Sequence, residues 1–395
     1  MLLPIEGALD EYRRTVVRLD TGRVPVEAAL GAVLAEAPAA RIDLPRFTQS
    51  SVDGYALRSV DGMVSRELVG TSAAGDPSGV AVGPGQAVRI LTGGMLPEGA
   101  DAVARQEIVD RDGSHVRLRE AVTERTAIRY AGEELAAGTA IAQIGQRVTS
   151  GLIAALAMAG IDSVLIRRRP RIAVLVTGDE VLRAGVSLGP GQIYDANGPL
   201  LRSWFIEQGY GAPSVVYVPD DEQALTDAMR QALDVADLVV TSGGVSVGDR
   251  DFVPAVAESL GVRKVFWKVA QKPGKPLWFG MRGATALLGM PGNPAAVLVC
   301  LAVHARAILG HMEGVTQALP AWRGGVLAAA VDADPERDRL VRMRLDDTDG
   351  VARLEVLPKQ DSHMLSNLAS AHALVWLPSR ETSFSAGERV RWLTL

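Results

Sequence analysis

Cysteine is almost absent from the sequence. Cys300 is the single cysteine among 395 residues, which excludes an intrachain disulfide framework and any zinc site built on cysteines. It stands in the apolar run AAVLVCLAV, so we expect a buried structural thiol rather than a nucleophile. Histidine is also scarce, with five residues, and neither an HExxH nor a GxSxG pattern occurs. This argues against hydrolysis by a nucleophilic triad.

The sequence also lacks a strong excess of charge and a long apolar run. Lys and Arg total 41 against 46 Asp and Glu, for a net charge of −5, and no basic stripe indicates a nucleic-acid partner. Arg167-Arg168-Arg169 is short and is predicted to be a solvated linker. No stretch reaches the roughly 18 apolar residues that cross a membrane, and the N-terminus MLLPIEGALDEYRR lacks the regions of a signal peptide. We therefore expect a cytoplasmic protein with no nucleic-acid and no membrane partner.

The most informative stretch that is present is a glycine loop between a strand and a helix. Leu238-Val239-Val240-Thr241 is short, apolar and β-branched, as in a strand. The loop SGGVSVG (242–248) follows it, and the segment FVPAVAESLG has helical spacing. Backbone N–H groups at such a junction favour binding of an anion. The sequence of the loop, however, matches neither the P-loop motif nor the GxGxxG dinucleotide-binding motif. Two interpretations stay open here: a phosphate-binding loop, and a tight turn that needs glycine only for its geometry.

Residues 170–314 alternate between strands and helices. The pattern predicts strands at 171–177, 214–218, 238–241, 264–269 and 284–289, with helices between most of them. Such alternation predicts a doubly wound, mostly parallel sheet, and ligands of these sheets bind outside the carboxyl ends of the strands. Polar or Gly/Pro residues follow all five strands, which favours a site at that edge.

Acids and lysines follow these strand ends. Carboxylates beside phosphate-binding groups suit Mg²⁺, and lysines add positive charge without fixing a geometry. Each residue has a plainer interpretation as well: a helix cap, a turn residue or the exposed face of a strand. Because the residues fall on adjacent strand ends, we favour a joint site formed by Glu180, Asp220, Asp251, Lys268, Lys272 and Lys275.

The remaining sequence predicts three further domains. Apolar residues recur with helical spacing over 5–20 and 25–34, and the helix GLIAALAMAGI lies within 141–169. Short β-type runs separated by Gly and Pro fill the region between, and the last part is rich in strands, with a hairpin turn at 346–350. We predict a discontinuous mixed helical domain (1–44 and 141–169), an inserted β-rich domain (45–140), the α/β domain (170–314) and a C-terminal β-barrel domain (315–395).

Several segments together resemble the MoeA family, the molybdopterin molybdenumtransferases, which include the E domain of gephyrin. The resemblance covers nearly the whole chain and rests, in order, on PVEAALGAVLAEAPAARIDLPRFTQSSVDGYALR, RILTGGMLPEGADAVARQE, VTGDEV, GQIYDANG, PDD, TSGGVSVGDRD, KPGKP and GMPGNPAAV. It implies an enzyme of molybdenum cofactor synthesis that converts adenylylated molybdopterin and molybdate, with Mg²⁺ as cofactor, into molybdenum cofactor and AMP. It also implies an elongated homodimer, with a dimerising helical domain, a molybdopterin-binding α/β domain, and a cleft shared between subunits.

The same resemblance implies roles for individual residues. It implies a catalytic set of Asp53, Thr92, Glu134, Glu180, Asp220, Asp251, Lys268 and Lys272, with Glu180, Asp220 and Asp251 as metal ligands. It implies substrate binding by Ser242, Gly243, Gly244, Ser246, Gly248, Lys275, Pro291, Gly292, Asn293, Pro294, Arg342 and Ser366.

The sequence departs from the family pattern at two positions. Val52 precedes DGYA where the family has Met, and Glu134 stands where the family has Asp. Two other functions stay open. One is a molybdopterin adenylyltransferase, a related enzyme that is also a candidate partner of this chain; the other is a non-catalytic scaffold like gephyrin.

Overall fold

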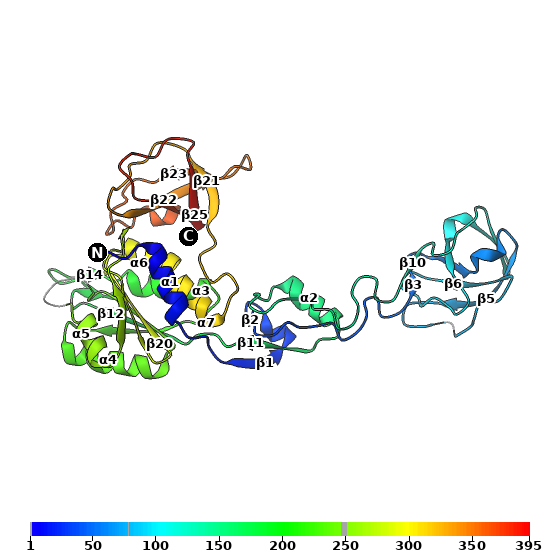
Figure 1. Ribbon diagram of the computed structural model, residues 1–395, viewed down its shortest axis with the longest axis horizontal. Coiled ribbons are helices and arrows are strands. Elements are labelled where there is room, and N and C mark those ends of the chain that lie inside the picture. Colours follow the sequence, from blue (N-terminus) through cyan, green and yellow to red (C-terminus); the bar gives the residue numbers. More distant parts are fainter. Residues whose placement is uncertain (1, 78, 246–250) are drawn as a thin grey trace.

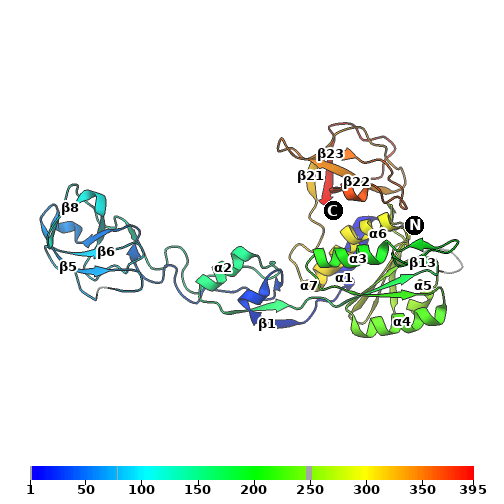
Figure 2. The ribbon, with the colours of Figure 1, turned by 180° about the vertical axis from the view of Figure 1, so that it is seen from behind.

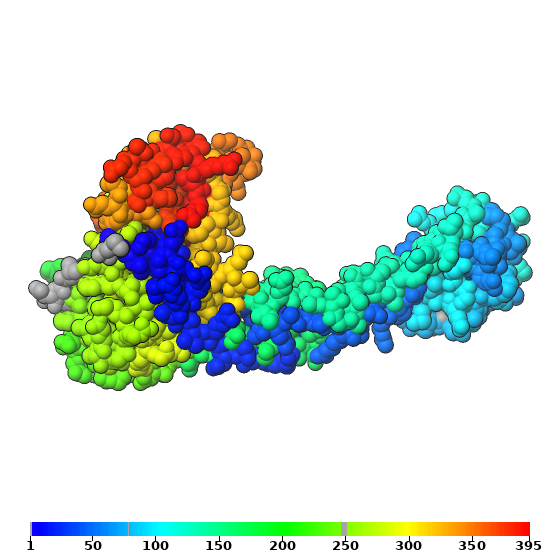
Figure 3. Space-filling view, in the orientation of Figure 1, coloured from blue at the N-terminus to red at the C-terminus, as the bar shows by residue number. Residues whose placement is uncertain are grey.

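The molecule is elongated, with a body at one end and a β-rich lobe at the other (Figure 1). The computed structural model describes residues 2–77, 79–245 and 251–395. The reverse view agrees that a narrow stalk joins the body to the lobe (Figure 2), and the stalk is the thinnest section of the space-filling view (Figure 3). The chain begins in the body, passes along the stalk, forms the lobe and returns. The β-rich region therefore lies between two passes of the chain along the stalk.

The body is built on a six-stranded sheet with the order β15-β12-β16-β20-β19-β17. The first three pairings are parallel, and β19 is antiparallel to both of its neighbours. Consequently β17 runs in the same direction as the four parallel strands. The predicted fold class is confirmed, although β19 was not predicted as a strand. The strands are β12 (Ile172–Thr177), β15 (Ser214–Val218), β16 (Leu238–Ser242), β17 (Arg263–Trp267), β19 (Trp278–Arg282) and β20 (Thr285–Met290).

Helices cover both faces of this sheet because successive strand residues point to opposite sides. Val174 and Val240 belong to the core under α3, α6 and α7, whereas Ala173 and Val239 belong to the core under α4 and α5. A π-helical turn, Leu301–Ala305, joins α6 to α7. The helices are α3 (Asn197–Glu207), α4 (Glu222–Val235), α5 (Val253–Ser259), α6 (Pro294–Cys300) and α7 (Arg306–Glu313).

The N-terminal helix α1 (Ile5–Thr15) forms on the predicted stripe. It packs on the body and not, as predicted, with residues 141–169. Its residues Ile5, Leu9 and Tyr12 are buried in the same core as α3, α6 and α7. Leu3 also forms a parallel bridge to Val269, beyond the end of β17. An apolar stripe shows that a helix is buried on one side, but not which surface it meets.

The stalk contains a three-stranded antiparallel sheet with α2 (Ser150–Met158) packed beside it. The helix predicted over residues 25–34 is wrong. A 3₁₀ helix, Val26–Ala29, forms there instead, followed by Gly31, whose φ of 72° is outside the helical range, and by a short strand. The stalk strands are β1 (Thr21–Pro25), β2 (Val33–Leu34) and β11 (Ser163–Arg167).

The β-rich lobe is a six-stranded sheet with the order β7-β4-β6-β5-β9-β8. The short pair β3 (Gln49–Ser50) and β10 (Ile128–Arg129) lies where the stalk enters it. The lobe strands are β4 (Gly54–Leu57), β5 (Arg66–Ser72), β6 (Gln86–Ile90), β7 (Ala102–Arg105), β8 (Val109–Asp112) and β9 (His115–Leu118).

The C-terminal region is a closed five-stranded barrel, as predicted. It closes because β22 pairs with both β23 and β24, at the two ends of the order β22-β23-β21-β25-β24. A turn after Asp346 joins β22 to β23, which confirms the predicted hairpin. The barrel strands are β21 (Arg323–Leu327), β22 (Asp338–Asp346), β23 (Arg353–Val356), β24 (Ala373–Leu377) and β25 (Arg389–Thr394).

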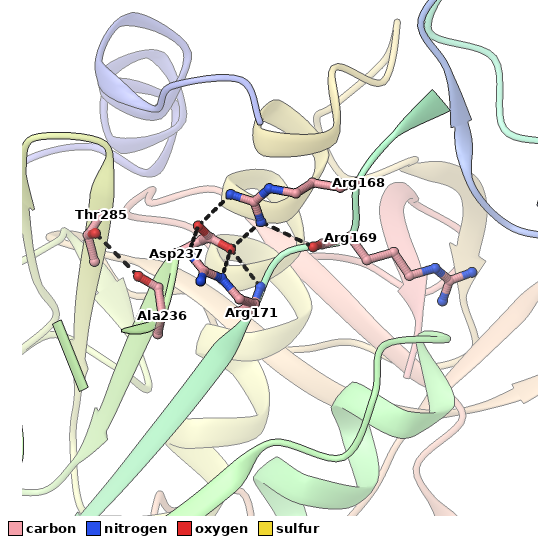
Figure 4. Close-up of polar contacts among 6 residues, drawn as sticks. All are labelled: Arg168, Arg169, Arg171, Ala236, Asp237 and Thr285. Atoms are coloured by element: carbon pink, nitrogen blue, oxygen red, sulfur yellow. Dashed lines mark hydrogen bonds and ion pairs between the residues drawn. The ribbon is translucent and has the colours of Figure 1, made fainter. Parts of the chain in front are cut away.

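An ion-pair cluster fixes the stalk to the amino end of the sheet (Figure 4). The guanidinium of Arg168 donates to both carboxylate oxygens of Asp237, at 2.6 and 2.8 Å, and the backbone N–H of Arg171 donates to the same carboxylate at 2.8 Å. Burial acts to raise the pKa of Asp237, but these hydrogen bonds outweigh it and hold the pKa well below its usual range. Arg168 is therefore a paired structural residue, not a purely solvated one as its run predicted.

Among the described residues, one helix is long and apolar enough to cross a membrane by length and composition. It is Pro294–Glu313, and 89% of its most apolar window is buried inside the protein. Such burial is typical of the core helix of a soluble protein, so this helix is only weak evidence for a membrane span.

Candidate active site

The carboxyl ends of β12, β15, β16, β17 and β20 meet at one edge of the sheet, and two neighbouring cavities open there. The first, of about 480 Å³, contains four carboxylates, from Glu180, Asp195, Asp220 and Asp251. We call it the acidic cavity. Its walls also include the predicted residues Ser242, Gly243, Gly244, Gly292, Asn293 and Pro294.

The carboxylates of the acidic cavity come from different loops. Glu180 follows β12, Asp220 follows β15, and Asp251 follows the glycine loop. The described residues contain no group of three or more His, Cys, Asp and Glu placed to hold a metal ion. The helix cap that was one interpretation of Asp220 is provided by its neighbour Asp221, which accepts a hydrogen bond from Ala224 N–H at 2.7 Å. The structure thus brings the three predicted metal ligands to one cavity, as separate carboxylates.

The described part of the glycine loop is tightly packed. Gly243 and Gly244 have φ values of 95° and 67°, and a Cβ on Gly243 would lie 2.6 Å from Oγ1 of Thr177. The N–H of Gly243 donates to the carbonyl of Met290 at 3.0 Å, next to the loop after β20. Glycine is therefore required for geometry here, and the same turn forms a wall of the acidic cavity. Ser246 and Gly248, also predicted to bind substrate, lie outside the described residues.

Two buried polar residues hold the walls of the acidic cavity together. Asn197 donates from Nδ2 to Oγ of Ser242 at 2.7 Å and to the carbonyl of Gly292 at 2.6 Å. Asp195 accepts hydrogen bonds from the N–H of Asn197 at 2.8 Å and from the hydroxyl of Tyr217 at 2.7 Å. Burial, followed by the bond to Asp195, raises the pKa of Tyr217, so its hydroxyl stays a donor. These contacts tie α3 to the loops after β16 and β20.

The second cavity, of about 470 Å³, lies between the sheet and the barrel. It is lined by Lys272, Lys275, Arg337 and Arg339, with one carboxylate from Asp361. We call it the basic cavity. The short strand β18 (Gln271–Lys272) pairs with the start of β22, which brings the lysines of the body to the arginines of the barrel.

The two cavities share lining residues. Asn293 and His363 line both of them, and Pro291 lines the basic cavity. A third cavity of about 210 Å³ has Gly244, Asp251, Pro276 and Asn293 among its walls, which are residues of one or other larger cavity. The PGNP loop after β20 therefore stands between an acidic and a basic chamber.

Lys268 lies beside these cavities and is not among their lining residues. It has a φ of 73°, and its ammonium lies 4.3 Å from the ring centroid of Trp267. The indole N–H of Trp267 donates to the carbonyl of Val245 in the glycine loop at 3.1 Å. The structure thus places Lys268 over a side chain that supports the loop.

Arg342 and Ser366 are likewise not among the lining residues of the basic cavity. The guanidinium of Arg342 is buried and donates to the carbonyls of Met364 at 3.1 Å and Lys359 at 3.0 Å. Arg342 therefore shapes the loop whose Ser362 and His363 reach the cavity.

The residues predicted in the inserted region lie far from both cavities of the same chain (Figure 1). Asp53 accepts hydrogen bonds from the backbone N–H and the hydroxyl of Thr92, each at 2.7 Å. The backbone bond, then the hydroxyl bond, lowers the pKa of Asp53. Glu134 lies where the lobe joins the stalk, and its N–H donates to the carbonyl of Leu44 at 3.0 Å. The structure brings Asp53 and Thr92 together, but not to the acidic cavity of their own chain.

Several site residues were not predicted individually. Asp195 stands in GQIYDANG just before α3, and Asn197 is the first residue of that helix. An Asp placed there to accept helix N–H groups was a usable signal. Arg337 and Arg339 carried no comparable signal, because they reach the cavity only through pairing of the barrel with β18.

Comparison with known proteins agrees with this architecture. Three family models match the chain: the MoeA N-terminal region (domain I and II) at residues 3–160, the probable molybdopterin binding domain at 173–311, and the MoeA C-terminal region (domain IV) at 325–395. A molybdopterin molybdenumtransferase of Staphylococcus epidermidis is 30% identical over 98% of this chain and 94% of its own length. One from Staphylococcus aureus is 29% identical with the same coverage.

Solved structures show the same relationship. The molybdopterin biosynthesis MoeA protein of Pyrococcus horikoshii superposes with a TM-score of 0.85 and 28% identity, over 100% of this chain and 99% of that chain. The fold and the cavities define a multidomain α/β protein with two adjoining cavities at the carboxyl ends of the strands. The chain belongs to the MoeA family.

Proposed function

We propose that this protein is an enzyme of molybdenum cofactor biosynthesis, a molybdopterin molybdenumtransferase that converts adenylylated molybdopterin and molybdate into molybdenum cofactor and AMP. The observation that carries the proposal is the adjacency of the two cavities, which share Asn293 and His363. A substrate with a pyrophosphate linkage beside an oxyanion needs sites for a metal-bound phosphate and for a second anion. The acidic and basic cavities supply groups for each.

The acidic cavity fits Mg²⁺ at the pyrophosphate. This ion prefers oxygen ligands and uses one or two carboxylates with substrate phosphate and water. Separate carboxylates from Glu180, Asp220 and Asp251 match that need, because a closed cage would leave no position for the substrate. When bound, Mg²⁺ neutralises developing charge on the phosphates. Asn197 holds two walls of this cavity at fixed separation and so orients the substrate between them.

The basic cavity fits molybdate. Four cationic side chains face one carboxylate there, and a compact dianion is attracted by such a surplus of positive charge. The lysines come from the segment between β17 and β19 and the arginines from the barrel, so an oxyanion bound there would contact both domains. The dithiolene sulfurs of the substrate would receive the molybdenum, so the reaction needs no cysteine from the protein.

We further propose that the working enzyme is a homodimer with shared sites. The inserted lobe carries the ordered pair Asp53 and Thr92, yet it projects away from the acidic cavity of its own chain. In a two-fold dimer the lobe of a second copy can reach that cavity, and symmetry then gives two composite sites. The molybdopterin adenylyltransferase is the expected source of the substrate and a candidate partner.

The test is incubation of the protein with adenylylated molybdopterin, Mg²⁺ and molybdate, followed by measurement of AMP release and metal insertion. Metal-dependent AMP release with cofactor formation supports the proposal. Transfer of AMP from ATP to molybdopterin would instead identify an adenylyltransferase. Absence of both activities in a folded dimer would leave the scaffold function.

A further inference from the structure

A buried relay of hydrogen bonds lies behind the turn that carries both lysines of the basic cavity. We call residues 272–275 the lysine turn. Tyr12 of α1 bonds through its hydroxyl to Nδ1 of His304 at 3.0 Å, and Nε2 of His304 bonds to Oε1 of Gln271 at 2.8 Å. Nε2 of Gln271 then donates to the carbonyl of Gly274 at 3.2 Å. All three side chains of the relay are 0% exposed.

The chemistry of the end groups gives the relay one direction. The carbonyl of Gly274 can only accept, so the amide N–H₂ of Gln271 faces it and the amide oxygen faces His304. His304 must then be protonated at Nε2 and bare at Nδ1, where it accepts from the Tyr12 hydroxyl. Burial lowers the pKa of His304 to about 3, so the neutral ring that this arrangement needs is the stable form.

The turn and the relay are in close contact. Gly274 has a φ of 95°, and a Cβ on it would lie 2.5 Å from Nε2 of Gln271 and 3.0 Å from Sγ of Cys300. The π-helical turn Leu301–Ala305 contains His304, and such turns within α-helices occur often at functional sites. Lys272 and Lys275, on either side of this contact, are exposed toward the basic cavity.

We propose that Gln271 and His304 are positioning residues, which hold the lysine turn in the shape that binds an oxyanion. The inference rests on the proposed role of the basic cavity. Gln271 is one of the residues that line the basic cavity, but its side chain, like those of Tyr12 and His304, is 0% exposed, so the relay acts from behind the turn. It anchors the carbonyl of Gly274 from behind, and this fixes the backbone between the two lysines. Without that anchor the lysines keep their charge but lose their common direction.

The test measures molybdate binding and steady-state AMP release in Gln271→Met, which keeps the size of the side chain and removes its hydrogen bonds to His304 and Gly274, together with a longer one to Sγ of Cys300. We expect the Kd and the KM for molybdate to rise about tenfold, the scale of one lost buried hydrogen bond, with kcat changed less than about twofold. A purely structural defect would lower the active fraction, and hence kcat, at unchanged KM.

A second variant separates positioning from stability. Tyr12→Phe/His304→Phe/Gln271→Met removes the polar side chains of the relay together, so it leaves fewer buried groups unsatisfied than Gln271→Met and should recover thermal stability. Its affinity for molybdate should stay low, because Gly274 still has no donor. Leu233→Ala, in the core under α4, is the control: it should lose a similar amount of stability to Gln271→Met, and its KM for molybdate should not change.

The outcomes distinguish this inference from the proposed function. If Lys272→Ala weakens molybdate binding while Gln271→Met does not, the relay has no positioning role and the basic cavity keeps its function. Recovery of affinity together with stability in the triple variant also overturns the positioning role. If Lys272→Ala leaves molybdate binding unchanged, both the basic cavity and the inference are refuted.

Discussion

The acidic and basic cavities share an edge of one sheet but differ in how they are built. The carboxylates of the acidic cavity stand in loops of a single domain, close to the strands that they follow. The basic cavity takes its two lysines from the body and its two arginines from the barrel. Local strand-to-loop connections can therefore place the carboxylates of the acidic cavity, although His363 of the C-terminal domain completes its wall, whereas the charged groups of the basic cavity meet only when two domains dock.

The charges of the two chambers stay apart because the PGNP loop separates them. Within the basic cavity, Lys272 comes within 4.0 Å of Asp334, but its side chain is 54% exposed, so this contact contributes little stability. Burial acts to raise the pKa of Asp334, yet hydrogen bonds from the N–H groups of Glu336 and Arg337 lower it. Asp334 thus stays ionised beside the cavity, where it pairs with Arg337 and, more weakly, with Lys272.

The largest effect is expected in the acidic cavity. Asp251→Ala and Glu180→Ala should each reduce AMP release by at least about 100-fold, because the metal-bound phosphates lose a carboxylate. Circular dichroism and thermal melting should show a normal fold. Turnover at the wild-type rate in either variant removes that residue from the site.

Neighbouring residues provide a matched control. Asp220→Ala should lose activity like the other two acids, whereas Asp221→Ala should lose only the cap of α4, about 1 kcal/mol of stability. Equal activity losses in both variants would show that the edge is sensitive to any change of charge.

The next effect tests whether the distant lobe completes the acidic cavity of a second subunit. Asp53→Ala and Asp251→Ala, each inactive alone, should complement when co-expressed. In a mixed dimer one site carries both changes and the other carries neither. With random pairing about half the dimers are mixed, so about a quarter of wild-type activity per chain is the ceiling.

Differential tagging establishes whether mixed dimers form in that experiment. If they form and activity stays at the level of the separate variants, each site is built within one subunit.

A smaller effect is expected in the basic cavity. Lys272→Ala should weaken binding of adenylylated molybdopterin and of molybdate by about tenfold, the scale of one charge-assisted contact, and Lys272→Arg should weaken it less. The difference from wild type should shrink as salt rises, since the attraction is largely Coulombic. Binding titrations at several salt concentrations measure this difference in affinity. Identical salt dependence in wild type and Lys272→Ala argues against a direct contact.

The smallest effect on activity is expected at the opposite end of the sheet. Asp237→Asn should lower stability by about 2 kcal/mol at pH 7 through its charged hydrogen bonds, while kcat and KM stay near wild type. A carboxylate with a lowered folded pKa stabilises the protein above its unfolded pKa of about 4, and the benefit is lost as pH falls below that value.

Thermal melting of the wild type and of Asp237→Asn between pH 7 and pH 3 checks this prediction. The difference between their Tm values should become smaller as the pH falls. A difference that widens there, or a large loss of activity at pH 7, would show that the stalk junction is coupled to the cavities.

Much of the architecture was readable from local patterns. Strand and helix alternation predicted the parallel sheet, and the strand-rich last part of the chain indicated a β-barrel. Strand β19, which is antiparallel to both of its neighbours, was not predicted. A helix was predicted over residues 25–34, where Gly31 has a positive φ and follows a short turn. The spacing of apolar residues does not show where a residue adopts a positive φ. The sequence of a short apolar strand likewise does not show which strands it pairs with.

What the sequence determined by itself was the gathering of three acids at one edge, because parallel strands bring the residues after their carboxyl ends to the same side of the sheet. Glu180, Asp220 and Asp251 needed only that rule. Tertiary structure decided the rest. Arg337 and Arg339 reach the lysine turn because β22 pairs with β18, and Tyr12 meets His304 across 292 positions of chain. Such contacts depend on which buried surfaces dock, and a linear pattern of apolar and polar residues does not specify that choice.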